Sequence, residues 1–414
     1  MENRIRPKIL LYHPTGNANV RAIADGFLKL GILDSFYTCI AIFRNTLSFK
    51  IFQIGILKEF QRRSFNADLK RFTRVRPLRE LCRLISQKFG LKRYIENEVG
   101  IFSVDNIYRD LDRYVSKNLK NIDAIYAYED GALESFRKAK LKGVKCFYEL
   151  PTGYWRAHRK YLGGELLEKS DWSKTLNCFL NSSEKLARKD AEIALADSII
   201  VASDFTKKTL DLYPGALPPV HVIPYGFPPV YKDRIYSSMG ARKLKVLFVG
   251  GMTQLKGVAN ILEAFDEFKN SAELTLVGRK SFDKCAALER GLAEHTWIPS
   301  LPHKKVLELM REHDVLLFPS LFEGYGLVIT EAMAQGTPVI TTNRTCGANF
   351  IVDGQNGWMV EPGNTASIVN KLREVIENVD SLPDIGRAAM QSADGLPIET
   401  FGVRVARALE IHLQ

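Results

Sequence analysis

The sequence predicts an α/β protein of two domains, each a doubly wound sheet of parallel strands, that face each other across a cleft. Short apolar runs alternate with helical patterns of ten or more residues in both halves of the chain, which is typical of βαβ units. A length of 414 residues exceeds one typical core. Residues 224–243, rich in Pro, Gly and Ser, interrupt this periodicity and separate the halves. Ligands of such sheets bind at the carboxyl ends of the strands.

The first half, residues 1–225, is assigned to an N-terminal domain. It begins with a buried strand at residues 8–13, followed by the turn PTGNAN and a helical pattern that stops at Gly31. A long helical pattern lies around residues 181–197. Further strands are predicted at residues 124–128, 145–150 and 198–203.

The alternation is cleaner in the second half, and residues 240–397 are assigned to a C-terminal domain. The last helix, within residues 398–414, is expected to pack back on the N-terminal domain. Strands are predicted at residues 245–251, 274–278, 315–319 and 338–342, and helices at residues 258–268, 304–313 and 327–336.

Composition indicates an ordinary globular protein, with 46% hydrophobic and 25% charged residues. The six cysteines are scattered without a C-x-x-C pair, so free thiols in a reducing compartment are expected. The first apolar run is too short for a signal-peptide core, and the longest, residues 46–57, is about half a membrane span and contains Lys50. We therefore expect a cytoplasmic protein without a transmembrane helix.

Positive charge is concentrated in the first half. Residues 1–240 carry 40 Lys and Arg against 26 Asp and Glu, whereas residues 241–414 carry 18 against 21. Residues 50–93 alone hold 13 basic and three acidic residues. This asymmetry favours an anionic surface or substrate for the first half, although a solvated basic face would give the same pattern.

The stretch FPSLFEGYGLVITEAMAQGTPVITT, residues 318–342, places Glu323 and Glu331 around a run of glycines. A strand precedes Glu323, and a helix follows the glycines and ends at Gly336. A helix N-terminus behind glycines offers unpaired N–H groups and a positive dipole end, which suit an anion. The pattern favours a ligand with phosphate and hydroxyl groups, although surface carboxylates near a helix start remain an alternative.

This stretch resembles, almost residue for residue, the E-x7-E signature of the retaining glycosyltransferases of family 4, which have the two-domain GT-B fold. The resemblance covers most of residues 196–363 and, more loosely, the segment HPTGNANVRA near the start. It extends through ADSIIVASDFTKKTL (196–210), VIPYGF (222–227) and VLFVGGMTQLKGVANILEAF (246–265).

The resemblance implies a donor site, position by position. Glu323 would contact the donor sugar and stabilise the reacting centre, and Glu331 would hold the ribose hydroxyls. Lys256 would neutralise the departing diphosphate, the electrostatic role of a metal ion, so no metal is expected. The family usually carries an arginine where this chain has Gly251, and Arg279 is the candidate to replace it. The other implied donor contacts come from Gly324, Tyr325, Gly326 and Leu327.

The first half departs further from the family. Many members carry a His-Asp pair after a strand in the middle of this domain, where this chain has Glu149 and Pro151. His158 lies nearby and is either a catalytic residue or an ordinary packing residue. The remaining candidates are Gly16 and Asn17, on the donor side of the first strand-to-helix turn, and Tyr154, Trp155 and Arg156, as an acceptor-side aromatic platform or as buried packing.

The resemblance implies a retaining, metal-independent transfer of a sugar from a nucleoside-diphosphate sugar, of undetermined nucleobase, to a glycan or lipid-linked acceptor. Surface polysaccharide or glycolipid assembly is the expected role, with no cofactor beyond this co-substrate. A nucleotide-sugar epimerase of the same architecture, and a non-catalytic basic protein that binds membranes or nucleic acid, are the alternatives. No nucleic-acid module is recognisable, so a nucleic-acid partner is not expected.

Within residues 50–93, the segment 76–96 predicts an amphipathic helix. Its apolar stripe either packs into the domain core or rests on an anionic leaflet, which would make the protein peripheral on the inner face of a membrane. The stripe consists of Leu78, Leu81, Cys82, Ile85 and Phe89, and the surrounding basic residues are Arg79, Arg83, Lys88, Lys92 and Arg93.

Overall fold

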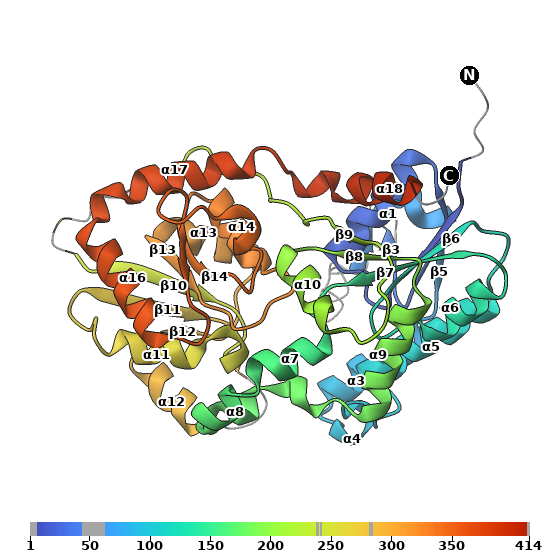
Figure 1. The fold of residues 1–414 in the computed structure, drawn as a ribbon, viewed down its shortest axis with the longest axis horizontal. Coiled ribbons are helices and arrows are strands. Elements are labelled where there is room, and N and C mark those ends of the chain that lie inside the picture. Colours follow the sequence, from blue (N-terminus) through green and yellow to red (C-terminus); the bar gives the residue numbers. More distant parts are fainter. Residues whose placement is uncertain (1–5, 44–62, 237–239, 241, 281–284, 412–414) are drawn as a thin grey trace.

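The computed structural model describes residues 6–43, 63–236, 240, 242–280 and 285–411, and these form two α/β domains with one large parallel sheet each (Figure 1). The predicted fold class is thereby confirmed. The apolar run at residues 46–57 and the first part of the basic segment, residues 50–62, lie outside the described residues.

The N-terminal sheet has seven strands in the order β5-β2-β1-β6-β7-β8-β9, and all neighbouring pairs are parallel. Its central strands are buried on both faces, which is why their sequences read as continuous apolar runs. The strands are β1 (Ile9–Tyr12), β2 (Leu33–Thr38), β5 (Thr73–Val75), β6 (Ala124–Tyr128), β7 (Lys145–Leu150), β8 (Ser198–Val201) and β9 (Val220–Val222); β3 (Ile42–Phe43) and β4 (Ser64–Phe65) form a separate pair.

Helices cover this sheet, and the first shows how the sequence sets their ends. The side chain of Asn17 accepts a hydrogen bond from the Val20 N–H at its start, and Gly31 ends it in the left-handed region, with φ of 71°. The helices are α1 (Ala18–Leu30), α3 (Leu78–Lys88), α4 (Lys92–Ile95), α5 (Val104–Lys117), α6 (Leu133–Lys140), α7 (Trp155–Leu162), α9 (Ser183–Leu195) and α10 (Asp204–Thr209).

The C-terminal sheet has six parallel strands in the order β12-β11-β10-β13-β14-β15. They are β10 (Leu244–Val249), β11 (Ala272–Val277), β12 (Thr296–Ile298), β13 (Val315–Phe318), β14 (Val339–Thr342) and β15 (Trp358–Val360). The helices are α11 (Val258–Phe265), α12 (Ala286–Ala293), α13 (His303–Glu312), α14 (Leu327–Ala334), α15 (Gly347–Phe350), α16 (Thr365–Glu377) and α17 (Leu382–Ala393).

The chain crosses between the domains at three places. The linker after β9 runs beside the connection from α17 to α18 (Phe401–Glu410), where the Phe227 N–H donates to the Leu396 carbonyl over 2.8 Å. Helix α18 returns to the N-terminal domain and packs on α1 (Figure 1). The third crossing is an excursion of the N-terminal domain itself, because α8 (Glu165–Glu168) and the 3₁₀ helix η3 (Ser170–Thr175) lie against the C-terminal domain.

Helices α1 and α18 touch through glycines. A Cβ atom on Gly402 would lie 1.8 Å from the Ala22 carbonyl oxygen, and one on Gly26 would lie 2.3 Å from the Gly402 carbonyl carbon. These distances leave no room for a side chain against rigid helix backbone. The α18 contact therefore depends on the absence of side chains at both positions.

We expect Gly402→Ala to lower the free energy of unfolding by about 1–3 kcal/mol, because the added methyl group forces the two helices apart. Gly395→Ala, in the connection that leads to α18, is the matched control, since a Cβ there meets no atom within 4 Å. Urea unfolding measures both. Equal losses in the two variants would show that the close contact is not what makes Gly402 important.

Candidate active site

A cavity of about 420 Å³ lies between the two domains, where the carboxyl ends of strands from both sheets meet. His13 and Glu129, which follow β1 and β6, belong to its N-terminal wall. Gly250, which follows β10, and Glu323, in the loop after β13, belong to its C-terminal wall. This is the position at which open α/β sheets bind ligands.

The C-terminal wall carries an ion pair between Lys256 and Glu323. Lys256 ends the short 3₁₀ helix η6 (Gln254–Lys256), and its Nζ contacts the Glu323 carboxylate. Both side chains are about one-fifth exposed, at 20% and 21%. Burial lowers the pKa of the Lys256 ammonium to about 8, which keeps it mostly charged at neutral pH. The pair thus places a cation and a carboxylate on the cavity wall at neutral pH.

The N-terminus of α14 adjoins this ion pair. Gly326 precedes the helix with φ of 89°, a left-handed conformation that a side chain would strain, and both Gly326 and Leu327 line the cavity. Glu331 lies one turn into α14, and its Oε1 is 2.9 Å from Nε2 of His303. This contact raises the pKa of His303. The backbone N–H groups and positive dipole end of α14 suit an anionic ligand.

The N-terminal wall carries a second buried carboxylate, Glu129. Its Oε1 is 2.7 Å from Nζ of Lys189, and its Oε2 accepts a hydrogen bond of 3.0 Å from the Thr152 hydroxyl. Burial raises the pKa of Glu129 against the opposing effect of Lys189. Each wall of the cavity therefore has one carboxyl group held by a lysine, but only Lys256, and not Lys189, lines the cavity itself.

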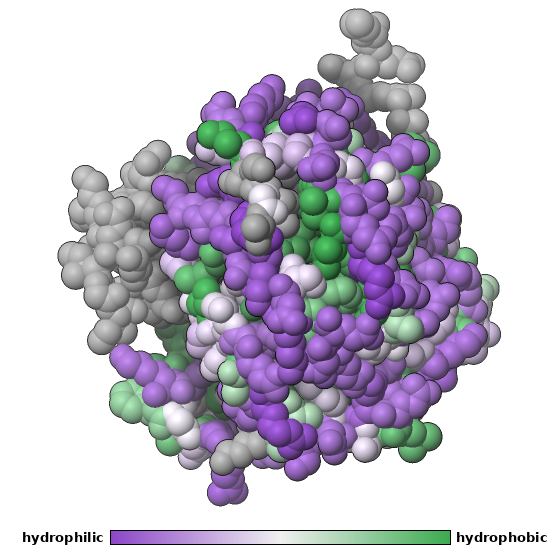
Figure 2. All heavy atoms as spheres, turned by 90° about the vertical axis from the view of Figure 1, so that its left-hand side faces the viewer, coloured by the Kyte–Doolittle hydropathy of each residue, from purple (hydrophilic) through white to green (hydrophobic). Residues whose placement is uncertain are grey.

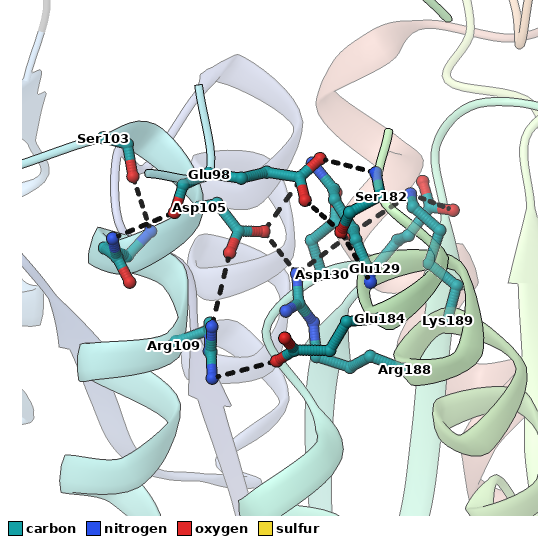
Figure 3. A network of polar contacts seen from close by, with 12 residues as sticks. Glu98, Ser103, Asp105, Arg109, Glu129, Asp130, Ser182, Glu184, Arg188 and Lys189 are labelled. Atoms are coloured by element: carbon teal, nitrogen blue, oxygen red, sulfur yellow. Dashed lines mark hydrogen bonds and ion pairs between the residues drawn. The ribbon is translucent and has the colours of Figure 1, made fainter. Parts of the chain in front are cut away.

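Glu129 belongs to a larger network of buried charges between α5, α9 and the end of β6 (Figure 3). Arg188 pairs with Asp105, and Lys189 lies 3.2 Å from Asp130 as well as near Glu129. Asp130 has φ of 72°, and its N–H donates over 2.9 Å to the buried carboxyl of Glu192. The turn that presents Glu129 to the cavity is thus fixed from two sides.

His13 holds the first strand-to-helix turn. Its Nδ1 accepts hydrogen bonds of 3.1 Å from the N–H groups of Thr15 and Gly16, and its Nε2 lies 3.2 Å from the Tyr108 hydroxyl. Two donors at Nδ1 require the proton on Nε2, and burial lowers the pKa of His13 to about 3. His13 is therefore neutral at physiological pH.

A third buried carboxyl, Glu149, lies at the end of β7. Tyr126 donates a hydrogen bond of 2.6 Å to its Oε2, and Tyr225 in the domain linker donates one of 3.2 Å to its Oε1. Burial raises the pKa of Glu149 to about 7. Tyr225 also lies against Tyr325 of the other domain, with ring centroids 4.8 Å apart. Glu149 thus anchors the linker below the cavity.

Two of the glycines that the resemblance implies for the donor site, Gly324 and Gly16, do not line the cavity. Gly324 instead packs on the N-terminal domain, since a Cβ there would lie 2.0 Å from the Pro151 carbonyl oxygen. Gly16 has φ of 54° and lies against the ring of Phe65, whereas its neighbour Asn17 lines the cavity.

The two positions considered for a second cation differ from the family pattern. Gly251 is exposed, and the space where a side chain would begin is open, with no atom nearer than 4.0 Å. Arg279 is also exposed and lies outside the cavity wall; its carbonyl accepts the Met252 N–H over 3.0 Å. Among the residues that line this cavity, Lys256 carries the positive charge.

The expected acceptor-side residues bind one another instead of lining the cavity. Asp190 on α9 accepts hydrogen bonds from Tyr154, Trp155 and Arg156, with distances of 2.7–2.8 Å, which attaches α7 to α9. His158 stacks on Phe322 with ring centroids 3.7 Å apart, and burial lowers its pKa to about 3. None of these four residues lines the cavity.

Sequence reasoning missed the polar residues of the N-terminal wall. His13 is the last residue of one predicted strand and Glu129 directly follows another, and this position at the carboxyl end was the available signal. No local signal links Glu129 to Lys189, which is 60 residues further along the chain. Tyr108 comes from the middle of α5, where an amphipathic pattern conceals it.

The fold and the cavity together define a class of protein. The structure is similar over its whole length to sucrose-phosphate synthase from Thermosynechococcus elongatus, with a TM-score of 0.66, 16% identity, and coverage of 98% of this chain and 99% of that one. It is also similar to the Anabaena protein HepE in complex with UDP-glucose, with a TM-score of 0.61, 16% identity and coverage of 98% and 100%. The fold is GT-B.

Residues 236–392 match the family of glycosyl transferases group 1, which confirms the resemblance found in the sequence. D-inositol 3-phosphate glycosyltransferase from Arthrobacter sp. (strain FB24) is 25% identical over 276 residues, which cover 58% of this chain and 65% of the relative. Glycogen synthase from Mycobacterium tuberculosis is 28% identical over 155 residues, covering 36% and 37%. The chain thus spans about two thirds or less of the length of these curated relatives.

We expect Glu149→Gln to change how stability depends on pH. A carboxyl whose pKa is raised in the folded state favours folding below its unfolded pKa, and this contribution is lost as pH rises through 7. Wild type should therefore lose stability on going from pH 5 to pH 8, and the variant should not. The free energy of unfolding of the variant, minus that of wild type, should rise by about 2–3 kcal/mol over this range. Urea unfolding at both pH values measures this difference. The exposed Glu399→Gln is the control, and a parallel gain there would contradict the assignment.

Proposed function

We propose that this protein is a glycosyltransferase that binds a nucleoside-diphosphate sugar in the interdomain cavity. The observation that carries the proposal is the Lys256–Glu323 pair beside the N-terminus of α14, with Glu331 one turn into the same helix. One wall thus offers a cation and helix N–H groups for a diphosphate and the Glu323 carboxylate for sugar hydroxyls, while Glu331 lies beside this wall, against His303.

In this proposal the diphosphate lies against the start of α14 and against Lys256. As the bond between the sugar and the diphosphate breaks, negative charge grows on the leaving group, and the ammonium and the helix dipole stabilise it. Glu323, released from its ion pair, accepts hydrogen bonds from the donor sugar, and Glu331 binds the ribose. These residues supply the electrostatic role of a metal ion, so we propose transfer without a metal. Retention of configuration follows from the family resemblance alone.

The acceptor is proposed to approach from the N-terminal wall. Glu129, held by Lys189 and Thr152, faces the cavity across from the donor residues and can accept a hydrogen bond from an acceptor hydroxyl. A glycan or a lipid-linked sugar offers such hydroxyls, as in the assembly of surface polysaccharide or glycolipid.

The experiment that tests the function is incubation with UDP-, ADP- and GDP-sugars in excess chelator. UDP-glucose comes first because the HepE structure was solved with it. We expect release of the nucleoside diphosphate, together with a new glycoside when a suitable acceptor is present. Isomerised donor would indicate an epimerase. Absence of donor binding would contradict the proposed function. Strict dependence on added Mg²⁺ or Mn²⁺ would contradict only the proposal that transfer needs no metal.

Two variants separate the glutamates. Glu331→Ala should weaken binding of the free nucleoside diphosphate by about 1.5–3 kcal/mol, the cost of losing a charged hydrogen bond. Glu323→Ala should spare that binding and lower turnover, because its proposed partner is the sugar. Calorimetry and a turnover assay measure the two effects. If Glu323→Ala weakened nucleotide binding and Glu331→Ala lowered only turnover, the roles proposed for the two glutamates would have to be exchanged.

We further propose that the N-terminal domain rests on an anionic membrane surface at the inner face, through α3 and α4. The structure divides the apolar stripe: Leu81 packs on the domain, together with Leu84, which is not part of the stripe, whereas three stripe residues face solvent. Leu78, Ile85 and Phe89 are 72%, 53% and 70% exposed. Exposed apolar side chains with basic neighbours are typical of surfaces that insert shallowly into a leaflet. No helix within the described ranges is long and apolar enough to span a bilayer.

The basic residues of this surface are of two kinds. Arg79 pairs with Asp110 over 3.1 Å, and Arg83 donates to Glu80 over 2.8 Å, so both stabilise the domain. The side chains of Lys88, Lys92 and Arg93 are exposed. We assign these three, and not the arginines, to lipid attraction.

We expect the protein to sediment with vesicles that contain anionic lipid and to dissociate in high salt, since each basic residue near such a surface contributes about 1 kcal/mol. Replacing Lys88, Lys92 and Arg93 with Gln should abolish sedimentation and leave donor binding unchanged. Lys371→Gln, in the C-terminal domain, is the control for lost charge. Equal sedimentation with neutral vesicles would refute charge-driven attachment.

A further inference from the structure

A segment of the N-terminal domain lies on the C-terminal domain and reaches the loop that carries Lys256. This segment, residues 163–176, which we call the strap, follows α7 and contains α8 and η3. Its 3₁₀ helix η3 contacts α12 and η6 of the C-terminal domain, and Figure 1 shows α8 away from the sheet of its own domain. The strap is thus a part of one domain that is built into the surface of the other.

Three contacts attach the strap to the C-terminal domain. Trp172 is 6% exposed and lies in η3, which contacts α12. The Cys285 thiol donates to the Asp171 carbonyl over 3.3 Å. Lys169 forms an ion pair of 2.5 Å with Glu263 of α11. The strap is therefore held by packing as well as by polar contacts.

The strap reaches the Lys256 loop through Gln254, two residues before Lys256. Gln254 is fully buried. Its backbone N–H donates to the Thr175 hydroxyl over 3.0 Å, and its side-chain Nε2 donates to Glu165 over 2.7 Å. Within the C-terminal domain, the same side chain bonds to Asn260 and to the Ala259 N–H. Gln254 is thus the junction between the strap and the loop.

A buried N–H without an acceptor is costly, so the loop keeps this conformation only while Thr175 is in place. Leu255 is also held by its own domain, since its carbonyl accepts the Ser320 hydroxyl and the Leu321 N–H, both over 3.0 Å. Two contacts of Gln254 differ, because their acceptors, Thr175 and Glu165, come from the N-terminal domain. The position of Lys256 therefore depends on how the two domains are apposed.

We propose that Thr175 and Glu165 are positioning residues that hold the Lys256 loop for the diphosphate, so that donor binding is linked to contact between the domains. This inference rests on the proposed function, because it takes Lys256 as the diphosphate ligand. Its distinguishing consequence is that loss of the strap contact weakens binding of the diphosphate and leaves recognition of the nucleoside intact.

The test compares Thr175→Val with Thr175→Ser. Valine has nearly the same shape but no hydroxyl, whereas serine keeps both the acceptor for Gln254 and the donor to the Trp172 carbonyl. Calorimetry measures binding of UDP, ADP and GDP and of the matching monophosphates. We expect Thr175→Val to weaken binding of the preferred diphosphate about fivefold or more, the effect of one lost hydrogen bond, and to leave the monophosphate unchanged. Thr175→Ser should bind like wild type.

Two further variants complete the design. Glu165→Ala removes the second strap contact to Gln254 and should reproduce the selective loss if Thr175→Val does not fold. Lys169→Met removes a strap contact that does not reach the loop and should bind both nucleotides like wild type. Thermal melts verify that the variants are folded.

The outcomes separate the two proposals. Suppose that the wild-type protein binds a nucleoside diphosphate. The positioning role alone is then overturned if Thr175→Val and Glu165→Ala keep the wild-type diphosphate affinity, or if they lose affinity equally for the diphosphate and the monophosphate. A wild-type protein that binds none of the nucleoside diphosphates would overturn the proposed function and this inference with it.

Discussion

The cleft depends on one close contact between the backbones of the two domains. Gly324 leaves no room for a side chain against Pro151, and its carbonyl accepts hydrogen bonds of 2.7 Å from the hydroxyls of Ser203 and Thr206. Because Glu323 is the preceding residue, this contact also fixes where the C-terminal wall begins. The distance between the two walls, and hence the size of the cavity, follows from a glycine that faces the opposite domain.

The buried charges around Glu129 fix the position of this side chain more than they stabilise the fold. Replacing a buried ion pair by apolar residues is often neutral or stabilising, so the network around Arg188 and Asp105 is weak support for a stabilising role. It does determine geometry, because Lys189 is shared between Glu129 and Asp130, and Glu192 accepts hydrogen bonds from the Asp130 and Ala132 N–H groups in the turn after Glu129. Such a network keeps a carboxylate at the cavity wall without letting it reach solvent or rotate away.

Many basic residues of the N-terminal domain are paired within the domain. Its excess of basic residues is real in the sequence, but the structure assigns many of them to neighbours within the domain, as with Arg76 and Asp110 or Arg63 and Glu80. Figure 2, which faces the C-terminal domain, shows a mostly hydrophilic surface interrupted by apolar patches. For the proposed membrane contact, net charge therefore points to a half of the chain, whereas the exposed Lys88, Lys92 and Arg93 of α3 and α4 point to a place on it.

The sequence by itself determined the fold class and the C-terminal wall, because both are encoded locally. Apolar periodicity reports strands and helices directly, and Glu323, Gly326 and Glu331 lie in one strand–loop–helix unit whose geometry the backbone fixes. The tertiary structure alone decided the partners that are far apart in the chain. Glu129 meets Lys189, and Gln254 meets Thr175, across separations of 60 and 79 residues. No local pattern records these contacts, because they exist only once separate elements have packed and the two domains have closed on each other.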